Sequence, residues 1–137
     1  MIFLRFKQYI YEIIILIFKI IIIILKSKFR LSELNLNFEL CHSYPRKLIV
    51  PKDISDEDLK VSSSFRTKNR IPTLCWYDKD KKSSLWRSSQ TKSGLTHQRN
   101  SFDEKLLKSI ADTSNGKITI FDARPYLNAL ANRVIIN

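Results

Sequence analysis

The sequence predicts an α/β domain, because strand signals and helix signals alternate along residues 31–137. Two capped stretches with helical spacing read as helices, and short β-branched or aromatic runs bounded by breakers read as strands. The expected order is strand, helix, strand, strand, helix, strand, helix. A chain of 137 residues can bury one core of this kind but cannot hold two complete enzyme domains.

The first strand and the first helix are expected on either side of a proline. Residues 47–50 form an apolar run that ends at Pro51, as a strand bounded by a breaker does. Ser55 then precedes the acidic residues 56–58. A serine cap followed by acidic side chains favours the positive end of a helix, so a helix is expected to about Arg66.

An antiparallel hairpin is expected over residues 70–90. Residues 70–77 are β-branched and aromatic, and Pro72 belongs at the beginning or edge of that strand because proline cannot donate to a ladder. Residues 78–82 form a charged turn, and residues 84–90 return as the second strand.

The second helix is expected to begin at Ser101, where an S-x-x-E capping box precedes an apolar stripe. The pair 115–116, Asn-Gly, ends it. Residues 118–121 are a candidate buried strand, and residues 126–133 read as a short helix after a proline. The stripe consists of Leu106, Leu107, Ile110 and Ala111.

Residues 1–30 differ in composition from the rest of the chain and form a separate segment. They hold eleven isoleucines, and the apolar stretch 13–25 is interrupted only by Lys19. A membrane-spanning helix needs about 20 mostly apolar residues, and a central lysine costs about 2.5–3.5 kcal/mol. This apolar N-terminal helix is therefore a marginal candidate for a single-pass membrane segment. A buried β-prone segment and translated non-coding sequence from an AT-rich genome are the two alternatives.

Composition excludes several classes of protein. Only Gly94 and Gly116 are present, so the glycine-rich phosphate loops of nucleotide-binding enzymes are absent. Cys41 and Cys75 are too few for a disulfide framework or a structural zinc site, and His97 has no companion at ligand spacing, so no metal or cofactor is expected. The net charge of +11 favours anionic partners. Nucleic acid is not expected, because basic and aromatic residues are not interleaved.

Neither cysteine has the spacing of a cysteine phosphatase, in which an arginine stands six positions after the nucleophile. Lys47 and Lys81 occupy those positions. Cys75 lies in an apolar strand pattern and is expected to be a buried structural thiol. Cys41 adjoins His42, but sequence neighbours rarely supply a nucleophile and its base. No catalytic residue is assigned.

Basic residues gather in two places, and such runs are usually solvated surface. Their functional interpretation is a weak landing patch for anionic lipid, at about 1 kcal/mol for each residue near a charged leaflet. The two groups are Arg66, Lys68 and Arg70, and Lys79, Lys81 and Lys82 at the hairpin tip.

Ordered motifs over residues 36–133 resemble the myotubularin phosphatase domain. F-E-L-C-H-S-Y-P at 38–45 is similar to the family's Y-x-L-C-x-T-Y-P, and R-I-P-T-L-C-W at 70–76 to its R-I-P-V-L-S-W. F-D-A-R-P at 121–125, with N-A-L-A-N-R at 128–133, is similar to its F-D-A-R-P-x-x-N-A-x-A-N-K/R signature. Further matches are L-I-V-P at 48–51, S-D-E-D-L at 55–59 and R-S-S-Q at 87–90.

This resemblance implies a partial cysteine-phosphatase-like (protein tyrosine phosphatase-like) domain. Residues 36–137 would be the N-terminal part of a phosphatase of phosphatidylinositol 3-phosphate and the 3,5-bisphosphate, lacking the catalytic Cys-x5-Arg loop and inactive as written. Asn132 matches the asparagine that contacts the inositol phosphate head group. Its alternative is a polar residue at a helix end. Asp122 and Arg124 are expected to form an internal ion pair that fixes the chain at its corner.

The expected partners are phosphoinositide head groups, a membrane surface and another myotubularin, at a cytoplasmic, membrane-associated location. The alternative function is a catalytically inactive, membrane-attached module that pairs with an active myotubularin. A sheet that lacks its later strands leaves open edges and apolar faces, so poor solubility is also expected.

Overall fold

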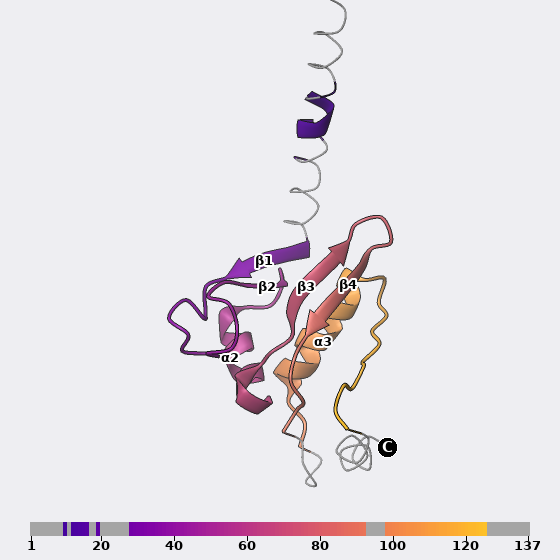
Figure 1. The fold of residues 1–137 in the computed structure, drawn as a ribbon. Helices are drawn as coiled ribbons and strands as arrows, with labels where there is room; N and C mark the ends of the chain where they lie inside the picture. Colours follow the sequence, from indigo (N-terminus) through magenta and orange to yellow (C-terminus); the bar gives the residue numbers. More distant parts are fainter. Residues whose placement is uncertain (1–9, 11, 17–18, 20–27, 93–97, 126–137) are drawn as a thin grey trace, which may run out of the picture.

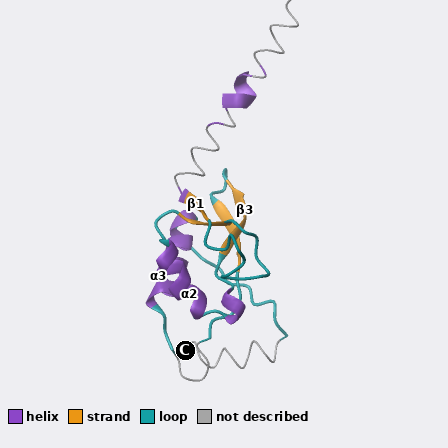
Figure 2. Cartoon of the chain, turned by 90° about the vertical axis from the view of Figure 1, so that its left-hand side faces the viewer, coloured by secondary structure: helices purple, strands orange, loops and turns teal. Residues whose placement is uncertain are grey.

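The computed structural model describes residues 10, 12–16, 19, 28–92 and 98–125. Its strands form two antiparallel pairs, β1–β2 and β3–β4. Two helices, α2 and α3, pack against each other on one side of the strands (Figures 1 and 2). This mixed arrangement agrees with a partial α/β domain. The element bounds are β1 Phe29–Ser32, β2 Leu48–Pro51, α2 Asp56–Ser64, the 3-10 turn η1 Thr67–Asn69, β3 Thr73–Asp78, β4 Ser83–Arg87 and α3 Ser101–Thr113.

The predicted first strand and first helix are both confirmed. In β2, Leu48 and Val50 are fully buried, as expected for a short apolar run. Helix α2 begins after Ser55, whose hydroxyl accepts a hydrogen bond from the Asp58 N–H at 3.0 Å. The Asp58 carboxylate accepts in return from the Ser55 N–H, which completes a capping box.

Strand β1 is an element that the sequence patterns do not predict. It pairs with β2, and Phe29 stands opposite Pro51. The buried Phe29 ring lies 5.1 Å from the Tyr77 ring and 5.9 Å from the Trp86 ring, measured between centroids. The aromatic contacts and the pairing with β2 explain why this short polar-apolar mixture forms a strand.

The apolar helix expected over residues 1–30 lies largely outside the described residues. Residues 10, 12–16, 19 and 28 are helical, whereas Phe29 and Arg30 belong to β1. Among the residues that the structure describes, no helix has the length and apolar character needed to cross a membrane.

The hairpin of β3 and β4 is confirmed, but a bulge changes which side chains it buries. Leu74 pairs with Trp86 and Trp76 pairs with Leu85, so Cys75 is the extra residue. A bulge reverses the alternation of faces along a strand. Trp76 and Leu85 consequently stand together on the outer face, 56% and 58% exposed, and Cys75 is exposed as well. The prediction that Cys75 is buried is wrong.

Helix α3 is confirmed, but its cap lies one residue earlier than predicted. The Asn100 side-chain oxygen accepts hydrogen bonds from the N–H groups of Phe102 and Asp103, both at 3.0 Å. Ser101 is already helical, because the carboxamide of Asn100 reaches the first-turn donors. At the other end, residues 115 and 116 adopt positive φ angles of 59° and 73°, as predicted for Asn-Gly. The stripe faces inward through Leu106, Ile110 and Ala111.

Residues 118–121 do not form the predicted buried strand. They have no regular secondary structure, and Ile120 and Phe121 are 74% and 87% exposed. No strand in the described part of the chain pairs with them, and a β-prone run gains stability only through pairing and packing. The predicted helix at 126–133 lies outside the described residues.

The core lies between β2, the two helices and the loop that joins β1 to β2. Asn35 fixes that loop: its side chain accepts from the Cys41 N–H at 2.8 Å and donates to the Cys41 and Pro45 carbonyls at 2.9 Å. The buried apolar cluster is Cys41, Tyr44, Leu48, Val50, Ile54, Leu59, Ile71, Leu106 and Ile110.

Candidate functional site

Arg66 was expected on the surface, but the structure buries it in an ion pair. Its Nε and Nη2 donate to the two carboxylate oxygens of Asp103, each at 2.7 Å, and the two side chains are only 6% and 3% exposed. Ser62 Oγ donates to the same carboxylate at 2.7 Å. Arg66 Nη1 donates to the Ser89 carbonyl at 2.8 Å. A bidentate pair of this kind removes the charge from any lipid-facing patch and joins α2, the chain after β4 and α3.

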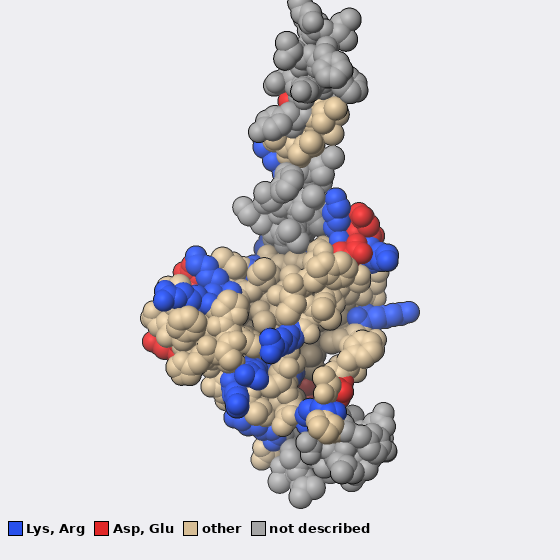
Figure 3. Space-filling model, viewed as in Figure 1, with Lys and Arg blue, Asp and Glu red and all other residues tan. Residues whose placement is uncertain are grey.

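The other basic residues of the predicted patch are more accessible. Lys68 is exposed, and so are the three lysines at the hairpin tip. Arg70 is half-buried, and its Nε donates to Ser43 Oγ at 2.9 Å. Figure 3 shows acidic and basic side chains mixed at the tip, where Asp78 and Asp80 accompany the lysines. The tip is therefore less cationic than its lysines alone indicate.

The F-D-A-R-P motif forms a turn closed by the predicted ion pair. Arg124 Nε donates to Asp122 Oδ1 at 2.8 Å, and Arg124 Nη2 donates to Asp122 Oδ2. The Arg124 guanidinium lowers the pKa of Asp122 to about 2. Arg124 Nη1 also donates to Gln90 Oε1 at 2.9 Å, which ties the turn to the chain after β4. The pair is confirmed, although the strand predicted before it is absent.

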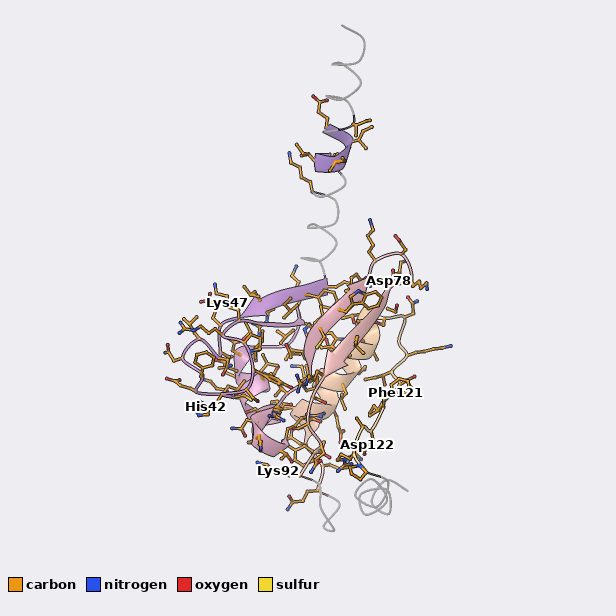
Figure 4. The ribbon with its side chains drawn as sticks, in the orientation of Figure 1. His42, Lys47, Asp78, Lys92, Phe121 and Asp122 are labelled. Atoms are coloured by element: carbon orange, nitrogen blue, oxygen red, sulfur yellow. The ribbon has the colours of Figure 1, made fainter. Side chains whose placement is uncertain are left out.

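Asn132, the predicted head-group contact, lies outside the described residues. His97 lies outside them as well. Cys41 and His42 do not form a nucleophile and base. The Cys41 thiol is buried and lies 3.3 Å from Ser43 Oγ, whereas His42 is exposed (Figure 4). Within the described ranges, no group of three or more His, Cys, Asp or Glu side chains could hold a metal ion.

A pocket that no sequence pattern indicated lies between the β1–β2 loop, β2 and the hairpin. Its volume is about 210 Å³. Tyr44 anchors it, because its hydroxyl donates to the carbonyls of Ile71 and Arg87 at 3.1 Å. Burial raises the pKa of Tyr44 to about 12, against the lowering effect of nearby Arg87 and Arg70. The lining residues are Ser43, Tyr44, Pro45, Lys47, Ile49, Thr73, Leu74, Cys75 and Arg87.

These residues come from three segments, and no local motif joins them. The pairing of hairpin and loop brings Arg87 next to Ser43 and Tyr44, far along the chain. The sequence offered one indication of this pocket, namely the basic residues Arg46, Lys47 and Arg87 in two of its segments. A larger, open hollow of about 510 Å³ lies elsewhere, lined by Lys28, Lys52, Asp53, Ser109, Asp112 and Thr113, whose charges are mixed.

Comparison with known proteins identifies the family. The model of the myotubularin-like phosphatase domain matches residues 14–136. Myotubularin of Xenopus tropicalis is 44% identical over 109 residues, which cover 78% of this chain and 18% of that protein. The phosphatidylinositol-3,5-bisphosphate 3-phosphatase MTMR2 is 44% identical in Gallus gallus and 42% in Bos taurus, over 78% of this chain and 19% and 17% of theirs. The chain thus spans less than a fifth of the length of these relatives. Because the family model covers nearly all of it, the chain belongs to the myotubularin-like phosphatase domain family.

Proposed function

We propose that this chain forms the N-terminal part of a phosphatase domain that removes the 3-phosphate from phosphatidylinositol 3-phosphate and phosphatidylinositol 3,5-bisphosphate. The observation that carries the proposal is its 44% identity to a relative named as a phosphatidylinositol-3,5-bisphosphate 3-phosphatase. The head group of these lipids is the proposed partner, at a cytoplasmic membrane surface.

Within such a domain, these residues supply framework and one head-group contact rather than the nucleophile. Cys41 is buried in the core. Cys75 lies in a bulge, and Lys81 occupies the position six residues later where a cysteine phosphatase has an arginine. A cysteine phosphatase needs both a thiolate and a phosphate-binding loop that stabilises the transition state. Asn132 is the residue proposed to contact the inositol phosphate, by its place in the A-N-R motif.

A chimera tests this role. The 109 aligned residues of the Gallus gallus relative are replaced by those of this chain, and phosphate release from vesicles of phosphatidylinositol 3-phosphate is measured. The chimera is expected to be active, and Asn132→Ala to lower its activity more than the exposed control Asn37→Ala. A folded chimera without activity on the 3-phosphate contradicts the proposal. The 137-residue chain assayed by itself is expected to release no phosphate.

A second candidate is an inactive module that pairs with an active myotubularin at a membrane. The observation that favours it is the exposed pair Trp76 and Leu85 on the outer face of the hairpin, since aromatic side chains are enriched at protein interfaces. Co-sedimentation of the full chain with an active myotubularin supports it if Trp76→Thr weakens the complex and Phe102→Thr, at a second exposed position, does not. Phosphate release by the chain alone excludes it.

A further inference from the structure

We propose that the pocket beside the β3–β4 hairpin binds a phosphomonoester anion, held by Arg70 and Arg87. This site is separate from the F-D-A-R-P turn: Figure 4 shows Lys47, which lines the pocket, and Asp122 on opposite sides of the molecule. The inference does not depend on the proposed phosphatase role.

Two cationic residues line this pocket, and a third contacts one of its lining residues. Lys47 and Arg87 line it, and Arg70, which does not, donates to Oγ of the lining residue Ser43 at 2.9 Å. Both guanidinium groups are also close enough to Tyr44 to act on its hydroxyl electrostatically. Figure 3 shows basic side chains across the middle of this face, away from the mixed charges of the hairpin tip.

Among the described residues, no ion pair neutralises the charges of Arg70 and Arg87. None of the described aspartates or glutamates lines the pocket. Lys47 pairs with Glu33 at 2.8 Å, but both side chains are about half exposed, so this pair is weak and can exchange. Arg70 and Arg87 form no ion pair in the described part of the chain. Arg46 is likewise without an ion pair there, and its guanidinium lies over the Phe38 ring. The other described arginines are all paired. The paired arginines are Arg30, Arg66, Arg99 and Arg124.

The pocket suits a small tetrahedral anion. Ser43 and Thr73, whose side chains carry hydroxyl groups, line it together with Arg87. Guanidinium groups bind phosphate oxygens through two parallel charge-assisted hydrogen bonds. A volume of about 210 Å³ is below the 300–1,000 Å³ typical of pockets for drug-sized ligands. The small volume and the cationic lining residues together favour a phosphate group, either on a lipid head group or on a soluble molecule.

Cys75 provides a reporter for the test, because its exposed thiol lines the pocket whereas Cys41 is buried. The rate of alkylation by iodoacetamide is measured for each cysteine of the full chain by mass spectrometry, at constant pH. Inorganic phosphate is expected to slow alkylation of Cys75, and chloride at the same ionic strength is not. Equal protection by chloride overturns the proposal.

Matched variants assign the effect to the pocket. Arg87→Gln removes a charge-assisted contact and is expected to raise the protecting phosphate concentration roughly tenfold, with a similar effect for Arg70→Gln. The control Lys79→Gln/Lys81→Gln removes charge at the exposed tip and is expected to leave protection unchanged. Unchanged protection in both arginine variants, or equal loss in the control, overturns the proposal. The fold is checked by circular dichroism.

The same readout distinguishes the two sources of the phosphate group. Protection by vesicles containing phosphatidylinositol 3-phosphate, but not by vesicles of phosphatidylinositol, supports a lipid head group. Protection by inorganic phosphate together with no effect of either vesicle supports a soluble ligand. Absence of protection by every phosphate probe refutes the site.

Discussion

Removing the charge of the buried Asp103 is expected to destabilise the protein more than removing a charge from one of its exposed ion pairs. Asp103 accepts two hydrogen bonds from Arg66 and one from Ser62, and both members of the ion pair are more than nine-tenths buried. Asp103→Asn leaves the Arg66 guanidinium buried without a counter-charge. Breaking a buried pair in this way costs about 3–5 kcal/mol. That is a large fraction of the roughly 5–15 kcal/mol by which a domain is stable.

The chain provides a matched control in the pair Arg99 and Glu104. This pair has the same bidentate geometry, with distances of 2.7 and 2.8 Å, but its side chains are 82% and 46% exposed. Glu104→Gln is expected to change stability little, because solvent screens the pair. Replacing both buried partners with leucine, in Arg66→Leu/Asp103→Leu, is expected to recover much of the loss, since no charge is left unpaired.

The assay is urea unfolding followed by the fluorescence of Trp76 and Trp86. The midpoint and slope give the free energy of unfolding for each variant. The reasoning is refuted if Asp103→Asn and Glu104→Gln lower that free energy equally. It is also refuted if the double leucine variant is less stable than Asp103→Asn.

Three further predictions concern local features. Asn100→Ala is expected to cost about 1 kcal/mol of stability in thermal unfolding, and Ser101→Ala much less, because Asn100 is the cap; the reverse order would restore the capping box predicted at Ser101. The pKa of Asp122, about 2 in the folded chain against 3.8 ordinarily, means that its ion pair is fully present above pH 4 and is lost as the pH falls through about 2; NMR titration should show the pKa returning toward 3.8 in Arg124→Gln. Trp76→Thr is expected to reduce self-association of the full chain in analytical ultracentrifugation, because the Trp76 side chain is apolar and 56% exposed beside the exposed Leu85; unchanged association contradicts this role for Trp76.

Features encoded within a few neighbouring residues could be predicted. The strand that ends at Pro51, the cap at Ser55 and the helix end at 115–116 depend on local backbone preferences and short side-chain contacts. The ion pair of Asp122 and Arg124 is of the same kind, because the two residues are separated by one position. The cap of α3 was missed by one residue, since Asn100 and Ser101 are both strong caps and only the geometry decides between them.

Features that depend on distant partners could not be predicted. Arg66 resembles a surface residue in sequence, and only its distant partner Asp103 makes burial favourable. Cys75 follows a buried-strand pattern, but the bulge exposes it. Residues 118–121 have the composition of a strand but no strand partner in the described part of the chain. The prediction of a buried strand from composition alone was therefore wrong.

Ordered motifs over about a hundred residues identify the family, because they can be recognised in the order of the amino acids without knowledge of the fold. Local residue patterns also predict most of the helices and strands. Which charges are buried and which remain accessible depends on the three-dimensional packing. Arg66 is neutralised by Asp103, whereas Arg70 and Arg87 form no ion pair in the described part of the chain. The physical reason is that electrostatic and packing energies depend on distance in space, which sequence separation does not give.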